Sequence, residues 1–244
     1  SISPRNHIPE RKLLLSSMDA VCPVSDQGTQ ELQHTWPQFA DKIHTRHLGT
    51  PDPGTMAECQ REPFTIISCA HLGAVKRMTR MPAILAAARD HGIDARWTHL
   101  GDGPDMGALR QEIAAHGVEE SVTLLGHVDN AAVMETQRSL SPSVFVNLSS
   151  SEGLPVSMME VASLGIPIVA TNVGGVSEIV SSANGHLLPA EFTDVQATKA
   201  LIRLATMPDD EYRQTCQASR QLWEDQFRDS VVYPAFCREV LKGR

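Results

Sequence analysis

The chain has 244 residues, a formal net charge of −8 and 41% hydrophobic residues, which is the composition of a folded protein with one large domain or with one domain and part of another. The negative charge excludes nucleic acid as a main partner, because the chain has no basic stripe to replace counterions, and it disfavours broad docking on anionic lipid. The five cysteines are scattered and never spaced as C-x-x-C, which favours a reduced cytoplasm and no structural zinc.

Membrane insertion and secretion are not expected. The longest apolar stretches are far shorter than a membrane span, and the beginning of the sequence lacks the apolar region and cleavage site of a signal peptide. We therefore expect a cytoplasmic protein, with at most peripheral contact at the inner face of the membrane.

Residues 1–60 have a different pattern from the rest of the chain. We predict a short strand at Val21–Ser25, a helix at Asp26–Ile43 and another strand at His44–Leu48, followed by the Pro/Gly-rich linker Gly49–Gly54. These elements are too few to bury an independent core.

From Phe64 onward, apolar strands and amphipathic helices alternate regularly. Strands that are apolar on both faces are typical of a parallel sheet covered on both sides. We therefore predict a doubly wound, Rossmann-like α/β domain at 61–228 and a C-terminal helix within 229–244. The predicted strands are Thr65–Cys69, Ala95–Leu100, Ser121–Leu125, Ser143–Leu148, Pro167–Ala170 and Gly185–Leu188. The predicted helices are Arg77–His91, one ending near His116, Asn130–Leu140, Pro155–Leu164, Val176–Ser181, Asp194–Thr206, Asp209–Gln226 and Val231–Lys242.

The segment Ser151–Glu160 joins the end of a predicted strand to the start of a predicted helix. Pro155 stands where a first helical residue is preorganised, so the preceding turn presents free backbone N–H groups and the positive end of a helix. This arrangement suits a diphosphate, and Gly153 lets a ligand approach the backbone closely. The sequence therefore predicts an anion site in this turn.

Glu160 lies in a helix whose other side chains are mostly apolar in nearly all directions, so we expect the helix to be buried. A buried carboxylate is costly unless it has partners. From the residues alone, Glu160 either pairs with a neighbouring loop or a lysine, or it binds a ligand. Glu152, just before the helix, has the position of an ordinary helix cap.

The run from Ser149 to Glu178 reads S-x-E-G-L-P-x-x-x-M-E, then small-x-G-x-P-I-V-A-T-x-x-G-G-x-x-E, and it resembles the signature of glycosyltransferase family 4. Asn184–Leu188, Gly101–Pro104 and Leu125–Val128 match further segments of that family in the same order, so that the resemblance covers roughly residues 62–190. Members of this family are retaining enzymes of GT-B fold, and the form seen here is similar to that of bacterial surface-polysaccharide enzymes. The resemblance implies the C-terminal, donor-binding half of a GT-B fold.

The resemblance also implies roles for the matching residues. It makes Lys76, which would neutralise the leaving diphosphate, and Glu152, which would accept hydrogen bonds from the donor sugar, the catalytic candidates. Glu160 would hold the ribose hydroxyls of the nucleotide. Family members often carry an arginine at the position of His71, so either Arg77 compensates or the chain belongs to a subgroup with Ser-Cys-x-x-Leu. The donor-binding candidates are therefore His71, Arg77, Val128 (through its main chain to the base), Gly153, Leu154, Pro155 and Glu160.

The implied function is binding of a nucleotide-diphosphate sugar, UDP- or GDP-linked, for transfer to a polysaccharide or lipid-linked acceptor with retained configuration. No metal or other cofactor is expected. Residues 1–60 resemble only the end of the acceptor domain and the linker, so we expect this chain to bind the donor without transferring it efficiently. Two alternatives stay open: a donor subunit or non-catalytic module that needs an acceptor-domain chain, and a GT-B nucleotide-sugar epimerase.

Other residues are given structural roles. We expect His44 and His47 at the surface, Cys69 in the core, and Gly174 and Gly175 in a tight loop before a helix.

Overall fold

The structure is a computed structural model and describes residues 10–241. Six strands form one sheet, and every neighbouring pair is parallel. They are β1 (Phe64–Cys69), β2 (Ala95–Leu100), β3 (Val122–Gly126), β4 (Val144–Asn147), β5 (Ile168–Thr171) and β6 (Gly185–Leu188). The strand order is β3-β2-β1-β4-β5-β6, so the chain reverses its direction of winding between β1 and β4. This is the doubly wound, Rossmann-like order, and the predicted fold class is confirmed.

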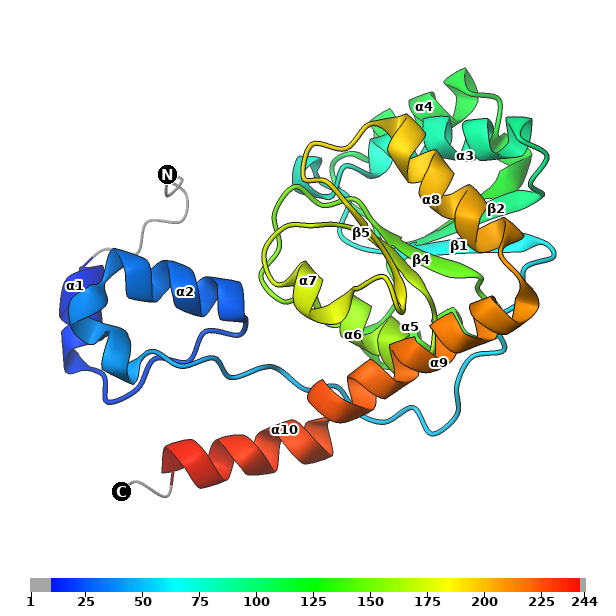
Figure 1. Ribbon diagram of the computed structural model, residues 1–244. Helices are drawn as coiled ribbons and strands as arrows, with labels where there is room; N and C mark the ends of the chain where they lie inside the picture. Colours follow the sequence, from blue (N-terminus) through cyan, green and yellow to red (C-terminus); the bar gives the residue numbers. More distant parts are fainter. Residues whose placement is uncertain (1–9, 242–244) are drawn as a thin grey trace.

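Helices cover both faces of this sheet (Figure 1). One face carries α3 (Met81–Asp90), α4 (Met106–Ala115) and α8 (Asp194–Thr206), which share a core with the buried Trp97 of β2. The other face carries α5 (Asn130–Ser139), α6 (Val156–Ser163), α7 (Val176–Ile179) and α9 (Asp209–Gln226), and its core includes the buried Trp223. The central strands β4 and β5 are buried at every residue, which is why their sequences are apolar without alternation.

Local sequence signals set several helix ends. Thr193 and Gln196 form a reciprocal capping box at the start of α8. Helix α9 follows Pro208 and has three acidic residues in its first turn, where they favour the positive end of the helix dipole. Both helices have the predicted bounds.

The segment before the sheet differs from the prediction. It contains α1 (Arg11–Ser17), α2 (Asp26–Thr35) and a 3-10 turn (Pro37–Lys42). The long helix predicted from Asp26 ends at Thr35 because Pro37 cannot continue it. The two predicted strands are also wrong: Val21 and Ile43 form a single parallel bridge, too short to be a strand pair.

Two helix starts and the burial expected of α6 also need correction. The helix predicted from Arg77 begins at Met81, because Arg77 has a left-handed backbone (φ 51°) between two short 3-10 turns, Ala74–Lys76 and Met78–Arg80. Pro155 caps α6 instead of starting it, and Val156 is 44% exposed, so this helix is not buried on all sides.

The C-terminal helix α10 (Asp229–Phe236) continues into a π-helical turn (Cys237–Leu241), and its predicted end at Lys242 lies outside the described residues. The other predicted elements agree to within about two residues at each end. The division of the chain at residues 60 and 228 stays a prediction. Within residues 10–241, no helix combines the length and the apolarity needed to cross a membrane.

Candidate functional site

The two predicted catalytic residues meet where the sheet changes its direction of winding. Lys76 follows β1 and Glu152 follows β4, and the Lys76 Nζ donates to Glu152 Oε1 at 2.7 Å. The Glu152 side chain is only 9% exposed, and that of Lys76 is 29% exposed. Ligands of open parallel sheets bind beyond the carboxyl ends of the strands at this kind of switch point, so the pair lies where a ligand is expected.

Asn147, the last residue of β4, orients the Glu152 carboxylate. Its amide nitrogen donates to Glu152 Oε1 at 3.1 Å, and its amide oxygen accepts from the Ser149 N–H at 2.9 Å. The loop is also joined to the loop after β1, since the Ser150 N–H donates to the Val75 carbonyl at 2.8 Å. Sequence reasoning missed Asn147. Its signal was a polar side chain at the end of an otherwise apolar, buried strand.

Arg77 holds these loops together through their carbonyl groups. Its Nε donates to Leu148 O at 2.6 Å, and one terminal nitrogen donates to Ser149 O at 3.0 Å and Ala190 O at 3.2 Å. The guanidinium also lies over the Phe192 ring. The structure therefore gives Arg77 a loop-joining role, and its predicted contact with the donor stays a prediction.

Glycines in the loop after β5 allow it to lie against the Glu152 loop. A Cβ at Gly174, whose φ is +57°, would lie 1.9 Å from the Glu152 carbonyl oxygen. The Gly175 N–H donates to Gly153 O at 2.7 Å. The predicted tight loop is therefore confirmed, and it also supports the backbone of Glu152.

The start of α6 presents free backbone donors beside this pair. Within residues 10–241, the N–H groups of Gly153 and Leu154 make no hydrogen bond. Gly153 is exposed, whereas Leu154 and Pro155 are buried and fix the turn in the core. An unpaired N–H at a helix start is a favourable place for an anion.

Glu160 lies one turn into α6 and is half-buried. In the described part of the chain, no loop or lysine bonds to its carboxylate, so the first of the two readings from the sequence is not observed. Burial raises the pKa of Glu160. Burial also raises the pKa of the neighbouring Cys69 thiol to about 11, with the charge of Glu160 acting in the same direction and Lys76 opposing it. Cys69 is half-buried and packs against the core on the α6–α9 side of the sheet, beside these charges.

His71 lies in the loop after β1, which also carries Lys76, and Val128 lies after β3. His71 is exposed next to the buried Leu72, whose N–H donates to Asp102 O at 2.9 Å and whose carbonyl accepts from Asp105 N at 3.2 Å. Val128 is half-buried after β3, and its main chain makes no hydrogen bond within the described residues. The structure therefore leaves both available to a ligand, without bringing either against Lys76 or Glu152.

A buried chain of hydrogen bonds fixes the end of β1. His99 Nε2 lies 3.2 Å from the Ala70 carbonyl, which can only accept, so this nitrogen carries the proton. His99 Nδ1 then accepts from the Ser68 hydroxyl at 2.7 Å, and Ser68 accepts from Trp97 Nε1 at 2.9 Å. His99 is fully buried, and burial lowers its pKa to about 4.

We expect this histidine to make the protein less stable in mild acid. The unfolded chain takes up a proton near the ordinary value of 6.5, whereas the folded chain resists it down to about 4, so stability present above 6.5 is lost as the pH falls. Between about pH 7 and about pH 5 the loss from His99 is about 2 kcal/mol.

His99→Gln should remove this loss, as measured by urea denaturation at the two pH values. His186, whose pKa is lowered by burial and by Arg203, also lowers stability in acid. It does so equally in parent and variant, so its effect cancels from the comparison. An equal loss in parent and variant would contradict the assignment.

The strand order makes this a doubly wound domain. The Lys76–Glu152 pair and the free N–H groups at its switch point suit an anionic ligand. The architecture is that of the C-terminal half of a GT-B fold. Residues 65–207 match the family model described as glycosyl transferases group 1, and the chain belongs to this family.

Curated relatives share parts of this sequence, and a solved structure shares its fold. The chain is 27% identical over 239 residues to WcaL of Escherichia coli, named as a colanic acid biosynthesis glycosyltransferase, covering 93% of this chain and 57% of the relative. It is 26% identical over 177 residues to the GtfA subunit of a UDP-N-acetylglucosamine–peptide N-acetylglucosaminyltransferase of Streptococcus pneumoniae, covering 70% of this chain and 34% of that one. Anabaena HepE, solved with UDP and glucose, superposes with a TM-score of 0.79 at 16% identity, over 99% of this chain and 69% of HepE. The chain thus spans about half or less of the length of these curated relatives.

Proposed function

We propose that this chain binds a nucleotide-diphosphate sugar, as the donor half of a retaining, hexosyl-transferring glycosyltransferase. The observation that carries the proposal is the Lys76–Glu152 pair at the switch point, beside the free N–H groups of Gly153 and Leu154 in the turn before α6. A cation and backbone donors suit a diphosphate, and a carboxylate accepts hydrogen bonds from sugar hydroxyls. Family membership and the UDP named in the HepE structure support a uridine nucleotide, with a guanosine nucleotide as the second candidate.

Glu160 and Val128 bind the nucleoside of the donor. The half-buried Glu160 carboxylate lacks a protein partner among the described residues, and two ribose hydroxyls would offset the desolvation that raises its pKa. The unpaired main chain of Val128 meets the base. His71 lies exposed on the loop after β1 and contacts the donor there.

The proposed chemistry is electrostatic. The bond between the anomeric carbon and the leaving phosphate breaks as the acceptor hydroxyl attacks from the same face, and its proton passes to the departing phosphate oxygen. Lys76 and the N–H groups of Gly153 and Leu154 stabilise the charge that develops on that phosphate. Lys76 supplies the positive charge, so the reaction needs no metal cofactor. The sugar passes to a polysaccharide or lipid-linked acceptor at the cytoplasmic side of the membrane.

Calorimetric titration with UDP- and GDP-linked sugars, without divalent cations, tests the proposal directly. We expect saturable binding of one nucleotide class, and Glu160→Ala should weaken it about tenfold through loss of the ribose contact. Glu120→Ala, which removes an exposed acid from the turn before β3, is the control and should bind like the parent. If no nucleotide sugar binds the parent, the proposed function is wrong.

The second candidate is a donor subunit that needs another polypeptide. It is favoured by the length comparison and by the description of the pneumococcal relative as a subunit. Under this reading, the 244-residue chain binds donor but transfers sugar only after addition of a chain with a Rossmann-like acceptor domain. Efficient transfer by the purified chain alone would exclude this candidate.

A further inference from the structure

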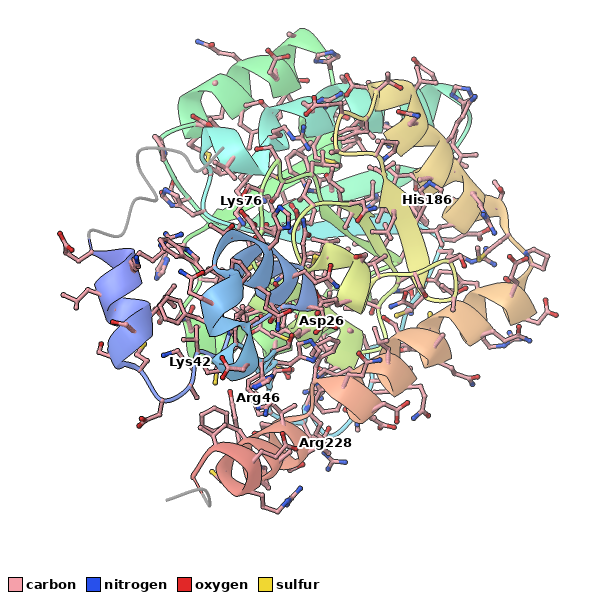
Figure 2. The ribbon with its side chains drawn as sticks, turned by 60° about the vertical axis from the view of Figure 1, so that its left-hand side comes forward. Asp26, Lys42, Arg46, Lys76, His186 and Arg228 are labelled. Carbon is pink, nitrogen blue, oxygen red and sulfur yellow. The ribbon has the colours of Figure 1, made fainter. Side chains whose placement is uncertain are left out.

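Glu178, the last acid of the motif, lies on α7 and bonds to the N-terminal segment. Its carboxylate accepts from the Asp26 N–H at 2.9 Å and 3.0 Å, and from the Gln27 N–H at 3.4 Å. These are the first two residues of α2, and Figure 2 shows Asp26 at the end of that helix beside α7. A carboxylate here satisfies N–H groups that the helix itself leaves free and favours its dipole.

His47, just before the linker, bonds to the same carboxylate. His47 Nε2 donates to Glu178 Oε2 at 2.8 Å, and the His47 ring lies 5.3 Å from that of Phe227. The expected surface position of His47 is therefore wrong: its side chain is 23% exposed and that of Glu178 is 14% exposed. Asp26, His47 and Glu178 hold possible metal-ligand atoms within 4.8 Å, but Asp26 is exposed and Glu178 already has three donors. We therefore interpret the group as a contact between segments.

The turn before α2 packs directly on the loops of the candidate site. A Cβ added at Gly175 would lie 2.8 Å from Ser25 Cβ, and one at Gly153 would lie 4.0 Å from a Val24 methyl. Val24 also packs against the core on the α6–α9 side of the sheet. The Glu178 contact thus holds this turn beside the loop that carries Glu152.

A second attachment lies at Thr50, near the start of the linker Gly49–Gly54. Its N–H donates to Phe227 O at 2.9 Å, and its carbonyl accepts from the Asp229 N–H at 3.1 Å. The Trp223 Nε1 donates to the Thr50 hydroxyl at 2.7 Å. Residues 10–46 are therefore attached through a fixed point at Thr50, through an ion pair between Arg46 and Glu239 of the C-terminal turn at 2.9 Å, and through the bonds to Glu178.

We propose that Glu178 is a positioning residue that holds the α1–α2 unit (residues 10–46) against the loops after β4 and β5. Loss of its carboxylate lets this unit pivot about Thr50, away from Gly153 and Gly175. The inference rests on contacts within the chain alone, so it stands independently of the proposed nucleotide binding.

Hydrogen–deuterium exchange of the full chain tests this role. In Glu178→Ala, the amides of the first turn of α2 and the Gly175 amide, which donates to Gly153 O, should exchange about tenfold faster, while β1 and β4 keep the protection of the parent. Glu31→Ala is the matched control, because it removes an exposed acid from the middle of α2 and should leave exchange unchanged. His47→Gln removes one of the three donors to Glu178 and should give a smaller increase at the same amides.

The outcomes separate the alternatives. Unchanged exchange at the start of α2 in Glu178→Ala would overturn the proposal. An equal increase throughout the sheet would also overturn it, because Glu178 would then only stabilise the α/β domain. Exchange is read without nucleotide, so a failure of the proposed function leaves this test intact.

Discussion

Replacing Lys76 with alanine should weaken the binding of a nucleoside diphosphate by about a hundredfold, equivalent to about 3 kcal/mol. Two losses add in the same direction. The diphosphate loses a charge-assisted hydrogen bond, and Glu152, with its side chain 9% exposed, is left as an uncompensated negative charge facing the ligand. In a full-length transferase the same change should chiefly lower turnover, because the charge on the leaving phosphate is greatest in the transition state.

Matched variants separate these two losses. Lys199→Ala removes an exposed lysine from α8 and should bind like the parent, as measured by the same calorimetric titration. The double variant Lys76→Ala with Glu152→Gln should recover about tenfold of the affinity, because no unpaired carboxylate remains beside the phosphates. Parent-like affinity in Lys76→Ala would remove Lys76 from the site and with it the proposed chemistry.

The sequence predicts the sheet well because the central strands are apolar on both faces and the strands alternate with helices. It does not give the strand order. Lys76 and Glu152 lie 76 positions apart, and they meet only because β4 pairs with β1 and not with β3. The family resemblance supplied both residues, and the switch point in the fold supplies the reason that they are neighbours.

Sequence reasoning failed at Arg77, His47 and Asn147 for a common physical reason. The role of each depends on backbone geometry or on distant contacts, which residue type alone does not reveal. Arg77 has a left-handed backbone, so α3 begins only after it. Its guanidinium donates to carbonyl groups of other loops. The contact of His47 cannot be seen in the sequence, because its partner, Glu178, lies 131 positions away. Asn147 ends a strand of apolar residues, and only the structure shows that its amide donates to Glu152.

Gly174→Ala should lower the free energy of unfolding by at least about 3 kcal/mol and should abolish nucleotide binding at the candidate site. A left-handed backbone alone costs a non-glycine residue about 1 kcal/mol. The larger part comes from the new Cβ, which would lie 1.9 Å from the Glu152 carbonyl oxygen and 3.2 Å from that of Gly153. Relief of this overlap has to move the loop after β4, and with it the Glu152 carboxylate that Lys76 contacts.

Gly117→Ala separates backbone strain from steric overlap. Gly117 has a similar φ of +63°, but a Cβ there would meet no atom within 4 Å, so this variant should lose only about 1 kcal/mol and keep its nucleotide affinity. Urea denaturation gives the stability of both variants, and titration with the nucleotide that binds the parent gives the affinity. If both variants lose the same stability, the contact between the loops after β4 and β5 imposes no constraint. If Gly174→Ala is destabilised but still binds at parental affinity, the Glu152 loop is not part of the nucleotide site. The predicted combination, a large loss of stability together with a loss of binding, requires that the glycine in one loop sets the position of the carboxylate in the other.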